Sequence, residues 1–464
     1  MRAMRHPGDI LLVSTYELGH QPFNLASPLA FLARAGYAPV AVDTAVEPLQ
    51  DEVIARARLV AISVPMHTAL RLGVAVAERV RALNPAAHIC LYGLYAILNA
   101  GYLLDGRADT VLGGEYEASL LELVGRLERE EGGPDGDGRA VPHLARLPFA
   151  TPDRSSLPPL RRYAAFDGGG GAVPAGYVEA SRGCLHTCLH CPLTPVYRGR
   201  FFVVPREVVL ADIRQQVEAG ARHITFGDPD FLNGPGHVMR ILRSMHGEWP
   251  DLTFDATIKI EHILEHRRLF PELRGLGCAF VVSAVESLSD TVLTGLDKGH
   301  TRADVVGALE VLDAAGIPMR PSLLPFTPWT TLADYLDLLD FFESRDLLDH
   351  VDPVHFSIRL LVPPGSALLD RPDTARWLGP LDAASFTYEW RHPDPRLDEL
   401  QRAVAAVVEE GERDGADPVE TFGRIKALAY AHAGRDEPVE TRHTRGGVLT
   451  ARRPVPKLTE SWFC

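Results

Sequence analysis

The sequence predicts an α/β protein in three parts: an N-terminal Rossmann-like parallel sheet, a partial (β/α)6 TIM-like barrel and a mostly helical C-terminal extension. Short apolar strands alternate with helices from residue 9 to about 125, and again from 173 to about 370. Such alternation is typical of parallel sheets covered by helices. Polar or glycine-bearing loops follow every predicted strand of the second part, as at the mouth of a parallel barrel.

The N-terminal part, residues 1–128, is expected to form one parallel sheet with helices on both faces. Ligands of such sheets bind at the carboxyl ends of the strands. No G-x-G-x-x-G motif follows the first strand, so a dinucleotide is not indicated. The predicted strands are Ile10–Val13, Pro39–Val42, Leu59–Val64, His88–Tyr92 and Thr110–Leu112, and the predicted helices are Ala26–Ala35, Ala69–Leu83 and Ala118–Leu127.

Residues 129–172 have the composition of a domain boundary. The stretch 130–138 is acidic and glycine-rich, 152–159 is proline-rich, and 168–171 is a run of four glycines. We expect either a linker or an ordered connector that wraps the barrel.

The barrel is expected over residues 173–370, and the C-terminal extension over 371–464. Thr301 and Gly316 have the positions of the N-cap and the residue after the C-terminus of one barrel helix. The predicted strands are Gly176–Ala180, His223–Phe226, Leu252–Ile258, Phe280–Ala284, Met319–Leu324 and His355–Leu361, and two of the predicted helices are Arg206–Ala219 and Arg302–Ala315.

Three cysteines, Cys184, Cys188 and Cys191, have the spacing C-x3-C-x2-C on a loop after a predicted strand. Three thiolates this close can hold three irons of a [4Fe–4S] cluster and leave the fourth iron open for the amino and carboxylate groups of S-adenosylmethionine (SAM). A zinc site would need His186 or His190 as a fourth ligand within the same short loop. Disulfides are disfavoured because three of only six cysteines fall within eight positions.

Composition indicates a globular protein with no membrane partner. The formal net charge of −14 disfavours a surface that follows nucleic-acid phosphates. No apolar run reaches the roughly 18 residues of a membrane span. The N-terminus reads as a first strand rather than a signal peptide. We therefore expect a cytoplasmic protein, where a reducing compartment would protect the cluster.

The barrel segment resembles the radical SAM domain of the group that includes tRNA methylthiotransferases and cobalamin-dependent methylases. The resemblance is carried by the cysteine triplet, by 285–287 (VES) followed by 296–301 (LDKGHT), and by 364–366 (PGS). It implies that Glu286 contacts the SAM ribose or amino group. It also implies a SAM site that includes Gly227, Asp228, Ser287, Lys298, Pro364 and Gly365.

Three positions in the barrel segment have two possible interpretations each. Where this group usually has G-x-P-x-E-T, the chain has Phe326–Thr331, so Trp329 either covers a ligand or packs in the core. Asp228 and Asp230 form a carboxylate pair that could act on a substrate, and one of them could equally form a turn.

The N-terminal part resembles the cobalamin-binding domain often fused to such barrels, on the match of 108–117 (ADTVLGGEYE). The D-x-H-x-x-G motif that supplies an axial histidine is missing. The glycine pair after the fourth strand is Gly93-Leu94 here. Cobalamin is therefore a candidate third cofactor, and a domain that only shapes the substrate pocket is the alternative.

The last eight residues, KLTESWFC, resemble the C-terminus of a radical SAM family whose members end in Cys-(Cys or selenocysteine)-Ala-Glu-Pro. The match ends at Cys464, so we expect the natural chain to continue, with selenocysteine as the next residue. Cys464 is then a candidate catalytic nucleophile that could hold a thiophilic atom such as arsenic(III).

These observations predict an enzyme that reductively cleaves SAM and modifies a small, possibly thiophilic, molecule, with flavodoxin or ferredoxin as reductant. One alternative is transfer of the 3-amino-3-carboxypropyl group of SAM to arsenic(III). Others are a cobalamin-dependent methylase and a tRNA-modifying enzyme. A non-catalytic binding protein is the alternative from a different class, and the three intact cysteines argue against it.

Overall fold

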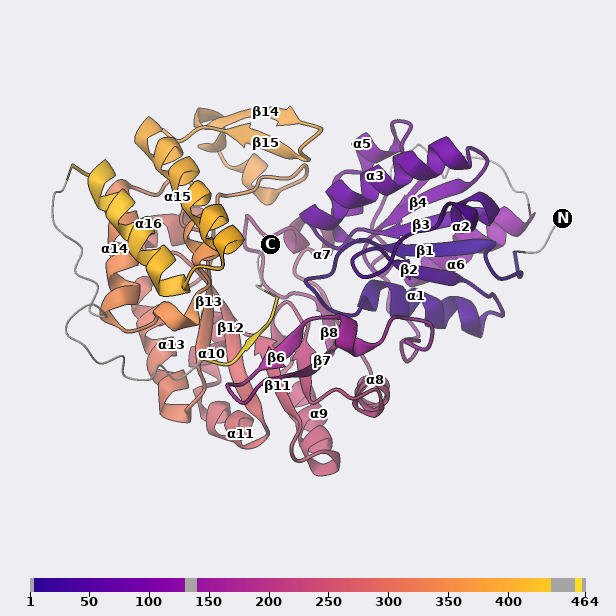
Figure 1. Ribbon diagram of the computed structural model, residues 1–464, viewed down its shortest axis with the longest axis horizontal. Helices are drawn as coiled ribbons and strands as arrows, with labels where there is room; N and C mark the ends of the chain where they lie inside the picture. Colours follow the sequence, from indigo (N-terminus) through magenta and orange to yellow (C-terminus); the bar gives the residue numbers. More distant parts are fainter. Residues whose placement is uncertain (1–3, 130–139, 435–454, 461–464) are drawn as a thin grey trace.

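The computed structural model describes residues 4–129, 140–434 and 455–460 of the 464-residue chain. Figure 1 shows the N-terminal sheet and its helices beside a larger second sheet, with helices α15 and α16 on the far side of that sheet. No helix among the described residues is long and apolar enough to cross a membrane.

The N-terminal domain is a five-stranded parallel sheet in the order β2-β1-β3-β4-β5. The expected strands are present to within one or two residues. Helix α1 begins at Phe23, three residues before the expected start, directly after Pro22. The elements are β1 Ile10–Ser14, α1 Phe23–Arg34, β2 Val40–Asp43, α2 Asp51–Arg56, β3 Leu59–Ser63, α3 His67–Leu83, β4 His88–Tyr92, α4 Leu94–Leu98, α5 Ala100–Leu104, β5 Thr110–Leu112 and α6 Glu117–Arg129.

Two apolar clusters cover the two faces of this sheet, as the alternation of side chains along a strand requires. Leu11 and Val13 lie in the cluster that packs under α3, whereas Ile10 and Leu12 lie in the cluster under α1 and α6. Cys90 lies in the second cluster and is fully buried, which confirms that it is a core residue.

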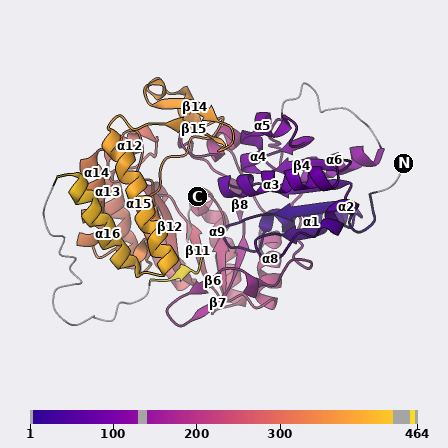
Figure 2. The same ribbon diagram turned by 45° about the horizontal axis from the view of Figure 1, so that its top comes forward.

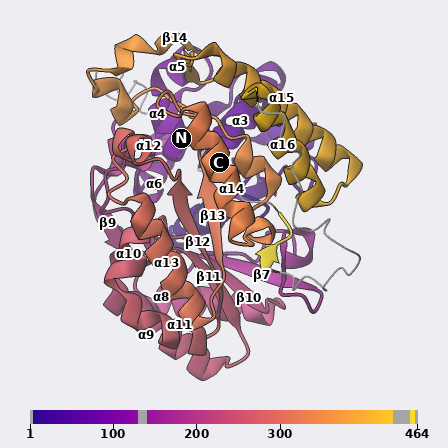
Figure 3. The ribbon, with the colours of Figure 1, turned by 90° about the vertical axis from the view of Figure 1, so that its left-hand side faces the viewer.

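The second sheet has the order β13-β12-β11-β10-β7-β6-β16 and forms a curled half-barrel. Strands β7, β10, β11, β12 and β13 are parallel, as predicted, and the helices between them lie outside the sheet (Figure 3). Its elements are β7 Ala172–Val178, β8 Ser181–Gly183, α7 Leu193–Tyr197, β9 Phe201–Val203, α8 Arg206–Glu218, β10 His223–Phe226, α9 Pro235–Glu248, β11 Thr253–Thr257, α10 Ile260–Glu265, α11 Phe270–Gly275, β12 Cys278–Glu286, α12 Asp290–Gly295, α13 Arg302–Ala315, β13 Met319–Leu323 and α14 Leu332–Ser344.

The prediction of a sixth barrel strand at His355–Leu361 is wrong. A 3-10 helix occupies Pro353–Phe356, and only one parallel bridge, between Phe326 and Arg359, continues the sheet. Proline fixes φ near −65° and cannot donate a ladder hydrogen bond, so Pro353 favours the turn over a strand at this point.

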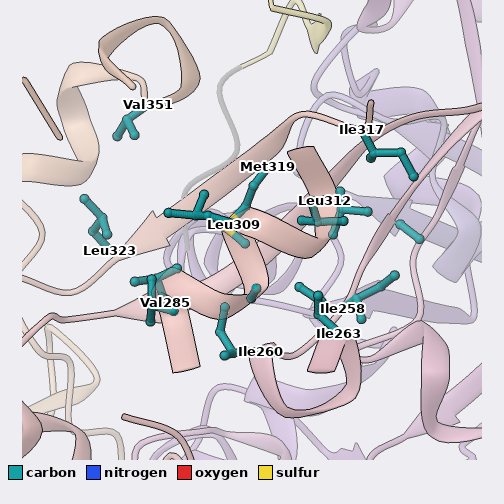
Figure 4. Close-up of a cluster of buried hydrophobic side chains, with 14 of the residues drawn as sticks. Ile258, Ile260, Ile263, Val285, Leu309, Leu312, Ile317, Met319, Leu323 and Val351 are labelled. Atoms are coloured by element: carbon teal, nitrogen blue, oxygen red, sulfur yellow. The ribbon is translucent and has the colours of Figure 1, made fainter. Parts of the chain in front are cut away.

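Apolar side chains from the helices and strands fill the space between α10, α13 and the sheet (Figure 4). Helix α13 begins with the expected cap: the Thr301 side chain accepts from the Asp304 N–H, and Asp304 accepts from the Thr301 N–H. Gly316 ends the helix in the left-handed conformation, at φ 69°. Cys278 opens β12 as a buried core residue, as expected.

Residues 140–172 form an ordered connector, the second of the two alternatives that the composition left open. Asp153 N–H donates to Ala26 O of α1, and the Arg154 guanidinium pairs with Asp212 of α8 at 2.7 Å. Strand β6 (Ala165–Asp167) then pairs antiparallel with β7. The domain boundaries themselves stay predictions.

The C-terminal extension packs against both the N-terminal domain and the barrel. The β14–β15 hairpin (Leu378–Asp382 and Thr387–Trp390) reaches the N-terminal domain, where Phe386 contacts the Tyr102 ring at 5.2 Å (Figure 2). Helices α15 (Pro395–Asp414) and α16 (Pro418–His432) cover the α14 side of the barrel. Strand β16 (Lys457–Leu458) pairs antiparallel with β6 at the edge of the second sheet.

Candidate active site

The cysteine loop is positioned by a small antiparallel hairpin. Strand β8 ends at Gly183, whose φ of 74° suits a residue without a side chain, and the loop begins with Cys184, whose N–H donates to Arg200 O. The Thr194 hydroxyl donates to Cys188 O at 2.8 Å, which folds the loop back on itself. Cys184 and Cys188 are buried and Cys191 is half-buried. The three predicted metal ligands therefore share one loop beside the strand ends.

The surroundings of the three thiols fit a [4Fe–4S] cluster. Lys259 Nζ lies 3.7 Å from Cys188 Sγ. Backbone N–H groups of His186 and Leu193 donate to the sulfurs of Cys184 and Cys191. Burial raises the pKa of Cys191 to about 12 without a metal. Positive charge and N–H donors around thiolates are the usual means of stabilising an iron–sulfur cluster.

Glu286, the predicted SAM contact, ends β12 in an unusual conformation. Its φ of 62° places it in the left-handed region that non-glycine residues rarely adopt. Its carboxylate lies 3.2 Å from Lys298 Nζ and 3.3 Å from His190 Nε2. Burial favours the neutral acid, but Lys298 and His190 outweigh it and hold the pKa of Glu286 well below its usual range. These three side chains connect the motif of residues 285–301 to the cysteine loop through His190.

Gly227 and Asp228 follow β10 and lie against the first barrel strand. A side chain at Gly227 would overlap the Tyr177 hydroxyl, so only glycine fits there. Asp228 accepts from the Ala180 N–H at 2.9 Å and from the Ser181 hydroxyl at 2.5 Å. Burial raises the pKa of Asp228 to about 7. Asp228 thus orders the chain just before the cysteine loop and also borders the cavity described below.

Asp230 is in a different environment from Asp228. It is fully buried, and His186 and His262 lie against one of its oxygens. Burial opposes its charge, but these histidines prevail and lower the pKa of Asp230 to about 2. The two predicted catalytic carboxylates therefore do not face one common point, and Asp230 is not among the residues that line the cavity.

The remaining predicted positions are near the cysteine loop but outside the cavity lining. The Ser287 hydroxyl accepts from the Ser289 N–H in a local turn. Pro364 and Gly365 lie in a loop whose next residue, Ser366, contacts Leu189 O at 3.4 Å. Trp329 donates to Asp373 and packs against Trp377, so the structure favours core packing for it. Cys464 lies outside the described residues.

A cavity of about 480 Å3 joins the two domains. Cys191, Gly227 and Asp228 border it on the barrel side, next to inward-facing residues of the parallel strands. The loops after β1, β3, β4 and β5 of the N-terminal sheet border it on the other side. The polar residues that β10, β11 and β13 supply are Thr225, Asp255, Thr257, Arg320 and Ser322.

Two charged residues on the barrel strands that line this cavity, Asp255 and Arg320, were not predicted from the sequence. Asp255 accepts from the Thr225 hydroxyl and from His223 through one oxygen only. Arg320 pairs with Asp352 at 2.9 Å through Nη2, while its buried Nη1 has no hydrogen-bond partner among the described residues. Both lie in the middle of buried strands, where alternating polar residues could have indicated a polar barrel interior.

The C-terminal segment forms part of the cavity wall. Lys457, Leu458 and Glu460 all line it. Glu460 accepts from the Tyr16 hydroxyl at 2.7 Å, and the Thr459 N–H donates to Ala165 O at 2.8 Å. Leu458 packs with Phe166 and Phe280 inside the barrel. The chain up to residue 460 is therefore anchored at the site.

A buried ionic cluster ties the N-terminal domain to the cysteine loop. Arg182, two residues before Cys184, lies 2.7 Å from Glu117, 2.8 Å from Glu179 and 3.4 Å from Glu115. Burial raises the pKa of Glu179 to about 8 although Arg182 opposes it. The GEYE sequence that carried the N-terminal resemblance thus serves this contact between domains.

The strand ends where the resemblance would place a cobalamin tail border the cavity, and two of their glycines lie close to neighbouring backbone. Gly93, after β4, lies so close to the chain after β3 that an added Cβ would be 2.8 Å from Val64 O. Gly114, after β5, has no room for a Cβ because His143 O lies against it. Cobalamin therefore stays a candidate cofactor, and the cavity at these strand ends is the space that could hold it.

Comparison with known proteins agrees with this geometry. Residues 178–342 match the radical SAM superfamily. The tRNA-2-methylthio-N(6)-dimethylallyladenosine synthase of Haemophilus influenzae is 26% identical over 215 residues, 43% of each chain. The ribosomal protein uS12 methylthiotransferase of Chlorobium phaeobacteroides is 22% identical over 262 residues, 52% of this chain and 57% of that one. The matches thus span about half the length of these relatives.

Two solved structures share the fold. The cobalamin-dependent SAM radical enzyme OxsB with aqua-cobalamin has a TM-score of 0.70 at 14% identity, over 91% of this chain and 72% of that one. The radical SAM methyltransferase TsrM of Kitasatospora setae, solved with tryptophan and a SAM analogue, has a TM-score of 0.58 at 16% identity, over 73% and 71%.

The chain therefore contains a radical SAM domain, an enzyme domain whose cofactors are a [4Fe–4S] cluster and SAM. Its fold, including the N-terminal sheet, is the fold of the cobalamin-dependent radical SAM enzymes. The predicted fold class is confirmed. The individual site residues and the C-terminal motif stay predictions.

Proposed function

We propose that the protein is a radical SAM enzyme that modifies a small molecule bound in the cavity between its two domains. The observation that carries the proposal is the position of Cys191 at the border of a cavity that the polar interior of the barrel also lines. The cluster and SAM would supply an electron and a carbon radical at that border. The chain's own residues would hold the substrate there and exclude water.

The chemistry of the wall favours a substrate with separated charges. The unpaired Nη1 of Arg320 offers a donor to an anionic group. Asp255, whose hydrogen bonds use one oxygen, offers an acceptor on β11, two strands away from Arg320 on β13. A zwitterion such as an amino acid fits this pair, and a cavity of about 480 Å3 has the size of a small-molecule site.

The test is anaerobic reconstitution followed by product analysis. We expect about four irons per chain and SAM cleavage on reduction, with both lost when Cys184, Cys188 or Cys191 is changed to Ala. Cys90→Ala, a buried cysteine in the N-terminal core, is the matched control and should keep both. Formation of 5′-deoxyadenosine or of 5′-methylthioadenosine would identify which C–S bond breaks. Turnover by the triple Cys→Ala variant would refute the proposal.

A second candidate, transfer of the 3-amino-3-carboxypropyl group to arsenic(III), is favoured by the anchored C-terminal segment. Residues Lys457, Leu458 and Glu460 line the cavity, and Cys464 follows Glu460 by four positions in the sequence. A tail thiol is a suitable ligand for a thiophilic atom. Selenocysteine after Cys464 would strengthen that chemistry.

Incubation with SAM, reductant and arsenite should then give an arsenic–carbon product with the full chain, and Cys464→Ala should abolish it while SAM cleavage remains. An arsenic–carbon product from Cys464→Ala at the normal rate would exclude a role for this thiol. The downstream codons decide whether selenocysteine follows.

RNA modification and cobalamin-dependent methylation are the rival functions. The curated relatives named above modify tRNA or a ribosomal protein, but the acidic balance of this chain disfavours RNA. Cobalamin-dependent methylation would need cobalamin to occupy the cavity at the N-terminal strand ends. A flavodoxin or ferredoxin is the proposed electron donor.

A further inference from the structure

Three ligand-type atoms converge at the cysteine loop, and none of their residues is among those that line the cavity. His186 Nε2 lies 3.3 Å from Asp230 Oδ2, and His262 Nδ1 lies 2.6 Å from the same oxygen. All three atoms lie within 4.8 Å of one another. We propose that this His–Asp–His site, formed by His186, Asp230 and His262, binds a divalent metal ion that favours nitrogen and oxygen ligands, such as zinc.

The unsatisfied hydrogen bonding of these atoms is the first argument. Each is buried, and none makes a hydrogen bond of acceptable geometry within the described parts of the chain. Buried polar atoms without partners are rare and call for an explanation, of which an ion is one. One metal ion would satisfy all three atoms at once. An ion pair between Asp230 and a protonated His262 is the competing arrangement.

The contacts behind these atoms are the second argument. The other ring nitrogen of His186, Nδ1, lies 3.7 Å from Glu261 Oε2. The second oxygen of Asp230 accepts from the Lys259 N–H at 3.2 Å. Metal-binding histidines commonly present their other nitrogen to a carboxylate, which fixes the ring and the tautomer, and metal-binding carboxylates are themselves hydrogen-bonded.

The position of the His–Asp–His site at the cysteine loop gives it a role in reduction of the cluster, and this role depends on the proposed function. His186 is the residue midway between Cys184 and Cys188, so a metal there would add positive charge next to the thiolates. Nearby positive charge stabilises the reduced, more negative cluster and raises its reduction potential. The metal would act in the same direction as Lys259, so the cluster would be reduced more easily.

Metal binding can be tested separately from the cluster. The Cys184→Ala/Cys188→Ala/Cys191→Ala variant cannot hold the cluster, and we expect it to bind one equivalent of Co2+ or Zn2+ by calorimetry, with the visible bands of Co2+ in an N/O site. Adding Asp230→Asn should weaken binding at least 10-fold. His432→Gln on α16 is the matched control and should bind as the parent does. No saturable binding by a variant that keeps its circular dichroism spectrum would overturn the proposal.

The holoenzyme provides a second measurement that does not depend on the triple variant. After anaerobic reconstitution with iron, sulfide and zinc, elemental analysis should give one zinc beside the cluster irons, and potentiometric titration should give a higher cluster potential with zinc than without it. Asp230→Asn should lose the zinc and the difference in potential while keeping the iron. Zinc content unchanged in Asp230→Asn would refute the site, whereas missing iron in the wild-type chain would instead refute the proposed function.

Discussion

At the scale of single residues, the site depends on charges that compensate one another in buried surroundings. Glu286 and Lys298 form one such pair, and Asp228 and Asp230 show how the environment separates two nearby carboxylates. Burial raises the pKa of Asp228 to about 7, whereas His186 and His262 lower that of Asp230 to about 2 in spite of burial. The sequence shows both as one short pair, so their separate roles could not be predicted from it.

Glu286→Ala is expected to weaken SAM binding about 10- to 100-fold. The change removes a buried carboxylate and leaves Lys298 without its partner, and the loss of a charge-assisted hydrogen bond costs roughly 1.5–3 kcal/mol. Calorimetric titration of the reconstituted enzyme with SAM measures the change. Glu310→Ala, on the exposed face of α13, is the control, and equal affinities for the two variants would contradict a role for Glu286 in SAM binding.

Asp228 should make the cluster-free protein less stable as pH rises. Its folded pKa of about 7 lies above the usual 3.8, so folding favours the protonated form. Below pH 4, Asp228 is protonated in both the folded and the unfolded protein. The free energy of unfolding then falls progressively between pH 4 and pH 7. One pKa unit is worth about 1.4 kcal/mol, so the loss approaches roughly 4 kcal/mol.

Urea unfolding of wild type and Asp228→Asn across this pH range checks the prediction. Asparagine cannot ionise and can still accept from the Ala180 N–H, so the stability difference between the two proteins should change with pH in favour of the variant. A difference that stays constant from pH 4 to pH 7 would show that Asp228 is not titrating there.

At the scale of elements, the periodicity of apolar residues and the signals at helix ends predicted most of the strands and helices. The five N-terminal strands and five parallel barrel strands are where their apolar runs place them. The strand predicted at His355–Leu361 does not form for a local reason. Pro353 begins a 3-10 helix, and only Arg359 makes a bridge to the neighbouring segment, at Phe326. The cavity wall was missed because Asp255 and Arg320 lie inside strands, and only the curvature of the sheet shows that their face is the interior.

Thr301→Ala should destabilise the protein by about 1 kcal/mol, because it removes the side-chain cap of α13. The midpoint of urea unfolding at constant m-value measures the effect. Thr301→Ser keeps a hydroxyl at the cap and should remain within a few tenths of a kcal/mol of wild type. Equal losses in the two variants would point to the threonine methyl group instead of the cap.

At the scale of the whole molecule, the site is built from segments far apart in the chain. The N-terminal loops, the barrel strands and residues 457–460 all border one cavity. Arg182 joins Glu115 and Glu117 of the first domain to the cysteine loop. The triplet of cysteines could be recognised because its ligands are close in sequence, whereas the His–Asp–His site could not, since His262 is 76 positions after His186.

Removing residues 455–464 should expose the apolar interior near Phe166 and Phe280, which Leu458 covers. We expect a loss of roughly 1–3 kcal/mol in stability and stronger binding of a hydrophobic dye. Removing only residues 461–464 is the control and should leave both unchanged, since β16 stays. If the two truncations behave alike, β16 does not contribute to closing the barrel.

The pairing of β16 with β6 also determines when one wall of the cavity can form during synthesis of the chain. Residues 457 and 458 meet residues 166 and 167, so a ribosome must complete every other described element before this wall can form. Until then, the nascent barrel is open at that edge while its cysteine loop already exists. Iron–sulfur assembly factors would have their widest access to the cysteine loop during that interval.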